Sequence, residues 1–135
     1  MALLVPSSAL IVDDESYVRA YLKLLLRPFE IETIYEAADV PQARELWAKH
    51  RPGLVLLDVN MPGESGLVLL RELRAADPEV YLVMLSTQSQ AANVKEAADA
   101  GADGFIRKDL PRMRIIDELK TIFEVPDAGG DQVQP

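Results

Sequence analysis

The chain has no cysteine, so disulfide bonds, thiolate zinc sites and cysteine nucleophiles are excluded from its chemistry. No apolar run approaches the roughly 20 residues of a membrane-spanning helix, and residues 1–8 lack the basic start of a signal peptide. Basic residues are also few: 14 lysines and arginines stand against 22 acidic residues, for a net charge of −8. That sign disfavours binding to a phosphate backbone. We therefore expect a cytoplasmic protein with no membrane segment and no direct contact to nucleic acid.

What the chain does have is an alternation of short apolar runs with helical patterns, over 135 residues that are 49% hydrophobic. This alternation predicts an α/β fold in which crossover helices connect the strands of one parallel sheet. The expected strands are 9–12, 31–36, 54–57, 80–85 and 103–106. The run 54–57 is apolar throughout, which is typical of a strand covered by helices on both faces.

The length and the pattern predict a single domain over 8–124. The last helix of that domain should start near Pro111. Residues 125–135 show no periodicity and several small or polar residues, so we expect a flexible C-terminal tail there.

Polar residues follow the predicted strands at four points. Asp13 and Asp14 come directly after the first strand, Asp58 after the third, Ser86 after the fourth and Lys108 after the fifth. Because the carboxyl ends of parallel strands meet at one edge of an open α/β sheet, we expect these side chains to share one cavity mouth. Three carboxylates that close together repel each other unless a hard divalent cation lies among them. The sequence therefore predicts an acidic pocket of the magnesium-binding type.

Each of these residues has an ordinary interpretation when taken alone. Asp13 and Asp14 could cap a helix, Asp58 and Ser86 could belong to turns, and Lys108 could be a solvated charge. The set is more informative, because its chemical types complement one another. Carboxylates hold a cation, one carboxylate can attack phosphorus, and a hydroxyl and an ammonium can bind phosphoryl oxygens.

The motifs around these residues resemble the response-regulator receiver domain of two-component signalling, over 8–124. The resemblance rests on Leu-Ile-Val-Asp-Asp-Glu at 10–15 and on Leu-Val-Leu-Leu-Asp-Val-Asn-Met-Pro-Gly-Glu-Ser-Gly at 54–66. It rests also on Val-Met-Leu-Ser at 83–86 and on Gly-Ala-Asp-Gly-Phe-Ile-Arg-Lys at 101–108. It implies a flavodoxin-like three-layer sandwich, in which five helices flank a five-stranded parallel sheet of order 2-1-3-4-5. It also implies phosphoryl transfer from the phosphohistidine of a histidine kinase or phosphotransfer protein to an aspartate.

The resemblance implies a role for each residue of the predicted cluster. Asp58 is the phosphoacceptor, and Lys108 pairs first with its carboxylate and then with the phosphoryl group. Ser86 hydrogen-bonds a phosphoryl oxygen, and Phe105 is the aromatic side chain that repacks with it. The implied cofactor is Mg²⁺ or Mn²⁺. The resemblance implies that Asp14 and Asp58 ligate it directly, that Asp13 acts mainly through a bound water, and that Asn60 offers its main-chain carbonyl.

The chain departs from the family pattern after Lys108, where Asp109 stands in place of a common proline. A cis bond before a non-proline residue costs about 2.5–4 kcal/mol, so we expect a trans bond between Lys108 and Asp109. Asn60 and Gln88 flank the path of an attacking water, and amides are poor general bases. We therefore expect a switch that catalyses its own phosphorylation and only a slow dephosphorylation, and not a turnover enzyme.

The sequence leaves several functional alternatives open. The chain is either a stand-alone regulator or the receiver fragment of a larger DNA-binding or enzymatic one, and its output partner is another protein, an effector domain or a second copy. Five basic residues near the end of the chain could form a surface that binds an acidic patch on that partner: Lys95, Arg107, Arg112, Arg114 and Lys120. A magnesium-dependent phosphohydrolase is a weaker alternative, because Asn60 stands where such enzymes need a second acid. A pseudo-receiver that acts as a constitutive scaffold is a third.

Overall fold

Strands and helices alternate along the computed structural model, which describes residues 2–59, 61, 63, 65–87 and 91–125. Within these ranges the elements are β1 (Ala2–Leu3), β2 (Ser8–Val12), α1 (Ser16–Leu26), the 3₁₀ turn η1 (Arg27–Phe29), β3 (Thr33–Ala37), α2 (Val40–His50), β4 (Leu54–Asp58), α3 (Gly66–Ala76), β5 (Tyr81–Ser86), α4 (Ala91–Asp99), β6 (Gly104–Arg107), α5 (Arg112–Phe123) and β7 (Glu124–Val125).

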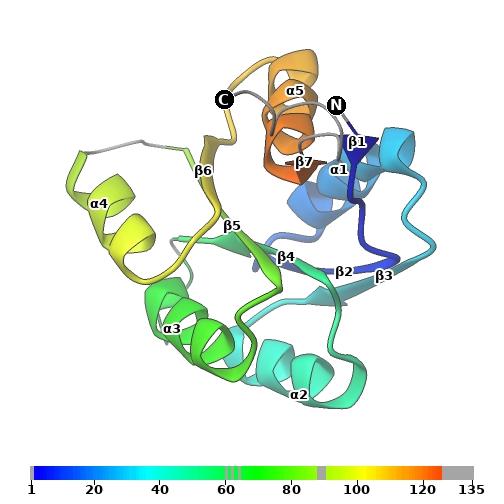
Figure 1. Ribbon diagram of the computed structural model, residues 1–135. Helices are drawn as coiled ribbons and strands as arrows, with labels where there is room; N and C mark the ends of the chain where they lie inside the picture. The colour runs from blue at the N-terminus through cyan, green and yellow to red at the C-terminus, as the bar shows by residue number, and fades with distance from the viewer. Residues whose placement is uncertain (1, 60, 62, 64, 88–90, 126–135) are drawn as a thin grey trace, which may run out of the picture.

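Five of the strands form one parallel sheet in the order β3-β2-β4-β5-β6 (Figure 1). Because β1 lies outside this sheet, the order is the predicted 2-1-3-4-5 in the chain order of the sheet strands. The central strand β4 is buried at all five positions. The predicted fold class is therefore confirmed, down to the fully covered apolar strand.

Helices cover both faces of the sheet, with α1 and α5 on one side and α2, α3 and α4 on the other (Figure 1). The first side packs Leu25 of α1 and Leu119 of α5 against the sheet, both almost fully buried. The second side packs Trp47 of α2 and Leu70 of α3 in the same way. Burial of these apolar faces on two sides of one sheet is the main stabilising contribution to the three-layer fold.

The strand register brings the polar residues of the sequence to one edge of the sheet. Val12 pairs with Leu57, so Asp13 and Asp58 each come one residue later on neighbouring strands. Ser86 pairs with Arg107, which places Lys108 one residue beyond the end of β6. The carboxyl edge of the sheet therefore carries the acidic residues, the hydroxyl and the lysine, as predicted.

Two details of the fold differ from the sequence-based expectation. The second strand of the sheet, β3, begins at Thr33 and not at residue 31, because η1 and the left-handed Glu30 (φ 57°) prolong the turn after α1. A second, two-stranded antiparallel sheet joins β1 to β7. Each of its strands has two residues, which is too short to produce a periodic pattern in the sequence.

The small β1–β7 sheet fixes the end of α5. The Leu4 N–H donates to the Phe123 carbonyl at 2.8 Å, and the Phe123 ring meets Phe29 and Tyr81 edge-on at centroid distances of 5.2 and 5.1 Å. Val125 of the predicted tail lies in β7, whereas 126–135 are outside the described residues. Among the helices that the structure describes, none combines the length and the apolar character needed to cross a membrane.

Candidate functional site: an acidic pocket at the carboxyl edge of the sheet

The centre of the pocket is an ion-pair cluster in which Lys108 bridges two aspartates. The Lys108 Nζ lies 2.7 Å from Asp13 Oδ2 and 3.1 Å from Asp58 Oδ1. All three side chains are largely withdrawn from water, with exposed fractions of 14% for Lys108, 1% for Asp13 and 6% for Asp58. The family resemblance implied the contact to Asp58, and the structure adds a shorter one to Asp13.

Burial and charge act in opposite directions on the Lys108 ammonium. Burial by itself lowers the pKa of Lys108. The hydrogen bond that Lys108 donates to Asp13 and the charges of Asp58 and Asp13 outweigh burial and raise the pKa above its ordinary value. The lysine is therefore a permanent cation at neutral pH. Its charge compensates the two buried carboxylates, which would otherwise repel each other at close range.

Asp13 is held by its backbone as well as by Lys108. Its N–H donates to the Ala37 carbonyl of β3 at 3.0 Å, which continues the sheet pairing by one residue. Its Oδ1 accepts the Glu15 N–H at 3.0 Å and closes the turn into α1. Asp14 follows in the same turn with an exposed side chain. The turn thus presents one fixed, buried carboxylate and one that faces solvent.

The donor set fits a hard divalent cation. Asp13, Asp14 and Asp58 each offer a carboxylate oxygen, and the three oxygens lie within 4.8 Å of one another. Oxygen ligands of this kind, two buried and one open to water, suit Mg²⁺, which keeps several of its waters when bound. The fourth predicted ligand, Asn60, lies outside the described residues, as does Gln88.

Ser86 and Phe105 occupy the neighbouring strands β5 and β6. Ser86 is fully buried, and its carbonyl accepts the Lys108 N–H at 2.7 Å, so the lysine is tied to the end of β5. Phe105 pairs with Met84, two residues before Ser86, which places Phe105 and Ser86 on the same face of the sheet. The Phe105 ring is half-buried against the core on the α2–α3–α4 side.

The bond between Lys108 and Asp109 is trans, as predicted, since the described residues contain no cis peptide. Asp109 instead forms a two-pronged ion pair with Arg107, at 3.0 Å to Nε and 2.6 Å to Nη2. Both side chains are about half exposed, at 47% and 49%. Arg107 and Asp109 flank Lys108 in the sequence, but their ion pair does not include the Lys108 ammonium.

Replacing Asp109 with alanine should therefore leave the pocket and the stability almost unchanged. Water already solvates both members of this ion pair, and exposed pairs contribute little to stability. The urea midpoint and the phosphorylation rate of Asp109→Ala should both stay within error of the wild type. A large loss of either quantity would show that the pair orients Lys108.

A second hollow opens beside Lys108, between α1 and α5. It has a volume of about 280 Å³ and is mostly apolar, with Val18, Tyr21 and Ile115 among its lining residues. Tyr17 lies at its rim, 70% exposed, and its hydroxyl donates to Glu15 at 3.0 Å. This hydrogen bond and the Glu15 charge raise the pKa of Tyr17. Sequence reasoning did not find this hollow, because its lining residues look like ordinary helix positions.

Fold and pocket together define a class of protein: an α/β domain whose sheet edge brings acids, a hydroxyl and a lysine to one point suited to phosphoryl chemistry. The chain belongs to the response regulator receiver domain family, whose model matches residues 9–120. Receiver domains are phosphorylation-controlled switches that bind Mg²⁺ at an acidic pocket. They interact with kinases or phosphotransfer proteins and with output domains.

Known proteins similar to this chain include both short and long regulators. The chain is 34% identical to the chemotaxis protein CheY of Bacillus subtilis over 110 residues, which are 82% of this chain and 92% of CheY. It is also 34% identical to the nitrate/nitrite response regulator NarL of Escherichia coli over 129 residues, 95% of this chain but 57% of NarL. Among solved structures, the CheX–CheY–BeF₃–Mg²⁺ complex of Borrelia burgdorferi matches with a TM-score of 0.82 at 27% identity, covering 90% of this chain and 92% of that one.

Proposed function

We propose that Asp58 accepts a phosphoryl group from the phosphohistidine of a histidine kinase or phosphotransfer protein. One observation supports this most directly: a nearly buried carboxylate lies 3.1 Å from a lysine and within 4.8 Å of two other acids. An Asp58 oxygen forms a bond to phosphorus while the bond from phosphorus to the imidazole nitrogen breaks. The product is a mixed anhydride on Asp58. The electron pair of the broken bond goes to the donor imidazole, which leaves as a neutral ring because its other nitrogen carries a proton when the transfer begins.

The residues around Asp58 position the reacting groups and compensate charge, which is most of what phosphoryl transfer requires of a protein. Lys108 is already within contact distance and pairs with a phosphoryl oxygen as that oxygen arrives. Ser86 supplies a hydroxyl for a second oxygen. Mg²⁺ or Mn²⁺, held by Asp13, Asp14, Asp58 and the Asn60 carbonyl, would neutralise the negative charge that the transfer adds.

Phosphorylation would change the surface through Ser86 and Phe105. A groove of about 160 Å³ lies beside Phe105 and is lined mainly by small residues, including Ala97, Ala98 and Ala102. When Ser86 moves toward the phosphoryl group, it leaves space behind it. The Phe105 ring would then turn from this groove into that space and reshape the surface over α4 and β6. Inverting a two-state equilibrium from 1:99 to 99:1 takes about 5.5 kcal/mol. Two or three hydrogen bonds to a charged group, at roughly 1.5–3 kcal/mol each, add up to about 3–9 kcal/mol, a range that includes this value.

The reshaped surface is less basic than its sequence indicates. Three of the five cations have an acidic neighbour: Lys95 pairs with Asp99, Arg107 with Asp109, and Arg114 with Glu118. A plain attraction to an acidic partner is therefore a weak basis for recognition here. We propose that the output partner, whether another protein, a fused effector or a second copy, recognises the shape that Phe105 controls.

The Mg²⁺ dependence of phosphorylation tests the proposed function. The chain should gain the mass of one phosphoryl group when acetyl phosphate and Mg²⁺ are both present, and no mass when EDTA removes the metal. Intact-mass spectrometry over a time course measures both. No gain under any condition would favour a pseudo-receiver, and steady release of phosphate from a general phosphate ester would favour a phosphohydrolase.

A further inference from the structure

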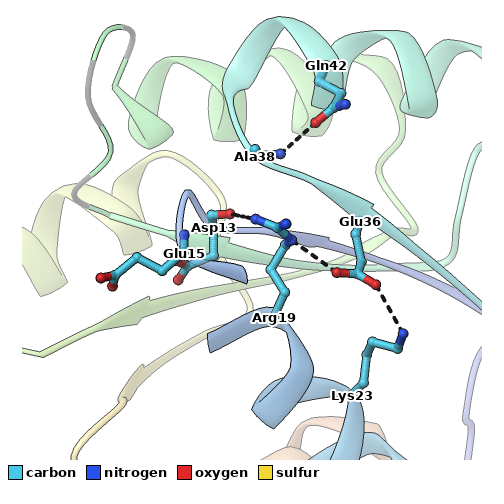
Figure 2. Close-up of polar contacts among 7 residues, drawn as sticks. All are labelled: Asp13, Glu15, Arg19, Lys23, Glu36, Ala38 and Gln42. Carbon is cyan, nitrogen blue, oxygen red and sulfur yellow. Dashed lines mark hydrogen bonds and ion pairs between the residues drawn. The ribbon is translucent and has the colours of Figure 1, made fainter. Parts of the chain in front are cut away.

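A short polar network supports the turn that carries Asp13 and Asp14, on the side of the edge strand β3 (Figure 2). Arg19, one turn into α1, donates from Nη1 to the Asp13 carbonyl at 2.7 Å. The same guanidinium contacts Glu36 of β3 through Nε at 3.0 Å. Its side chain is only 16% exposed. One arginine thus connects the helix, the edge strand and the turn that carries the pocket acids.

Glu36 is a fixed anchor for this arginine. It also contacts Lys23 Nζ at 3.0 Å, and the hydrogen bond from Lys23 together with that from Arg19 lowers the pKa of Glu36 despite its partial burial. The carboxylate is therefore ionised at neutral pH and holds one edge of the guanidinium. The rigid fork of that group then directs its other edge at the Asp13 carbonyl.

Both main-chain polar groups of Asp13, its N–H and its carbonyl, are therefore held by hydrogen bonds. Its N–H donates to the Ala37 carbonyl at 3.0 Å, and the turn after Ala37 is closed by an Ala38 N–H that donates to Gln42 Oε1 at 2.6 Å (Figure 2). Its carbonyl is held by Arg19. Because that carbonyl belongs to the peptide unit between Asp13 and Asp14, its orientation sets the direction in which the backbone presents Asp14.

We propose that Arg19 is a positioning residue for the metal pocket, acting through the Asp13–Asp14 peptide. The inference rests on the proposed function, since the acids are its point of action, but it adds a residue that never touches the metal or the phosphoryl group. Without Arg19 the peptide can rotate, and Asp14 and Asp13 no longer present their oxygens together. Losses of supporting contacts of this kind weaken metal affinity by about 10- to 100-fold.

The test is a Mn²⁺ titration of the full chain at neutral pH, with free Mn²⁺ measured by electron paramagnetic resonance. Arg19→Ala should bind Mn²⁺ at least about 10-fold more weakly than the wild type. Simple electrostatics predicts the opposite sign, because removing a nearby positive charge should favour a cation. Lys23→Ala is the matched control: it also removes a cation from Glu36 but leaves the Asp13 carbonyl untouched, so its affinity should equal or exceed that of the wild type.

Arg19→Lys gives a second variant if Arg19→Ala folds poorly in urea unfolding measurements. A lysine keeps the charge opposite Glu36, but a single ammonium cannot reproduce the fork, so its Mn²⁺ affinity should also fall. Wild-type affinity in either Arg19 variant, or an equal loss in Lys23→Ala, would overturn the positioning role and leave the proposed function standing. A wild-type chain that neither binds Mn²⁺ nor accepts a phosphoryl group would overturn both.

Discussion

An Asp58→Asn chain will gain no phosphoryl mass from acetyl phosphate and Mg²⁺, whereas the wild type will. The amide has nearly the shape of the carboxylate, so the buried side chain, 6% exposed, should still fit its place at the end of β4. It lacks the negative oxygen that attacks phosphorus. Loss of the reaction should therefore be complete at incubation times that phosphorylate the wild type fully. Intact mass shows this directly, and peptide mapping of the wild type after borohydride reduction locates the modified residue.

The matched control is Asp99→Asn, which removes a carboxylate from an exposed ion pair on α4 and should leave the mass gain intact. Asp13→Asn is a useful second comparison, because it keeps the nucleophile and removes one predicted metal ligand. It should slow the reaction and raise the Mg²⁺ concentration needed. A phosphoryl group found on Asp58→Asn would mean that another residue is the acceptor, and the proposed mechanism would then be wrong.

Replacing Lys108 with methionine should destabilise the metal-free protein by about 3 kcal/mol at neutral pH, because removing one partner of a buried ion pair leaves uncompensated charge. Methionine has a similar length, so little packing is lost. In the variant, Asp13 and Asp58 remain as neighbouring buried carboxylates, 1% and 6% exposed, without the ammonium that contacts both. Urea unfolding in EDTA measures the free energy of unfolding.

The pH dependence of this variant has a definite sign. In the wild type the pKa of Lys108 is raised above its ordinary value of 10.5, so its contribution to stability is fully present at neutral pH. That contribution is lost only as the pH rises through the raised pKa. Because Lys108→Met lacks the ammonium, its deficit relative to the wild type should shrink as the pH rises through that raised pKa.

Divalent cations give an independent check on the same variant. Mg²⁺ should stabilise Lys108→Met more than the wild type, because in the wild type the lysine already neutralises two of the acids that the cation would use. Lys95→Met, which removes a lysine with 78% side-chain exposure, should change neither stability nor its response to Mg²⁺. A Lys108→Met protein as stable as the wild type in EDTA would show that the cluster does not depend on this ammonium.

The pocket residues could be predicted from the sequence because an apolar strand and the polar residue after it are adjacent in the chain. Asp58 follows four apolar residues, so both the end of the strand and the place of the acid are visible without a structure. The shorter contact of Lys108 to Asp13 was not visible, because two aspartates on neighbouring strands compete for one ammonium and only side-chain geometry decides between them.

Arg19 and Glu36 show a different kind of limit. Seventeen residues separate them along the chain, and their contact depends on the rotation of α1 against the edge strand. Nothing in the pattern around Arg19 distinguishes it from any other polar residue on a helix surface. The β1–β7 sheet was missed for a third reason: its strands are held by main-chain pairing and by the α5 end, which leave no signature in two residues of sequence.

That small sheet has a practical consequence for handling the protein. By pairing Ala2–Leu3 with Glu124–Val125, it places these two segments side by side (Figure 1). β1 leads into the start of β2, whereas Asp58 ends the parallel strand β4, so the small sheet and the acid lie at opposite ends of the main sheet. A surface tether, fluorescent reporter or fused module attached beyond Val125 would start from that remote end. The acid pocket would stay open to an incoming donor, so kinase assays on immobilised protein are feasible without blocking the reaction.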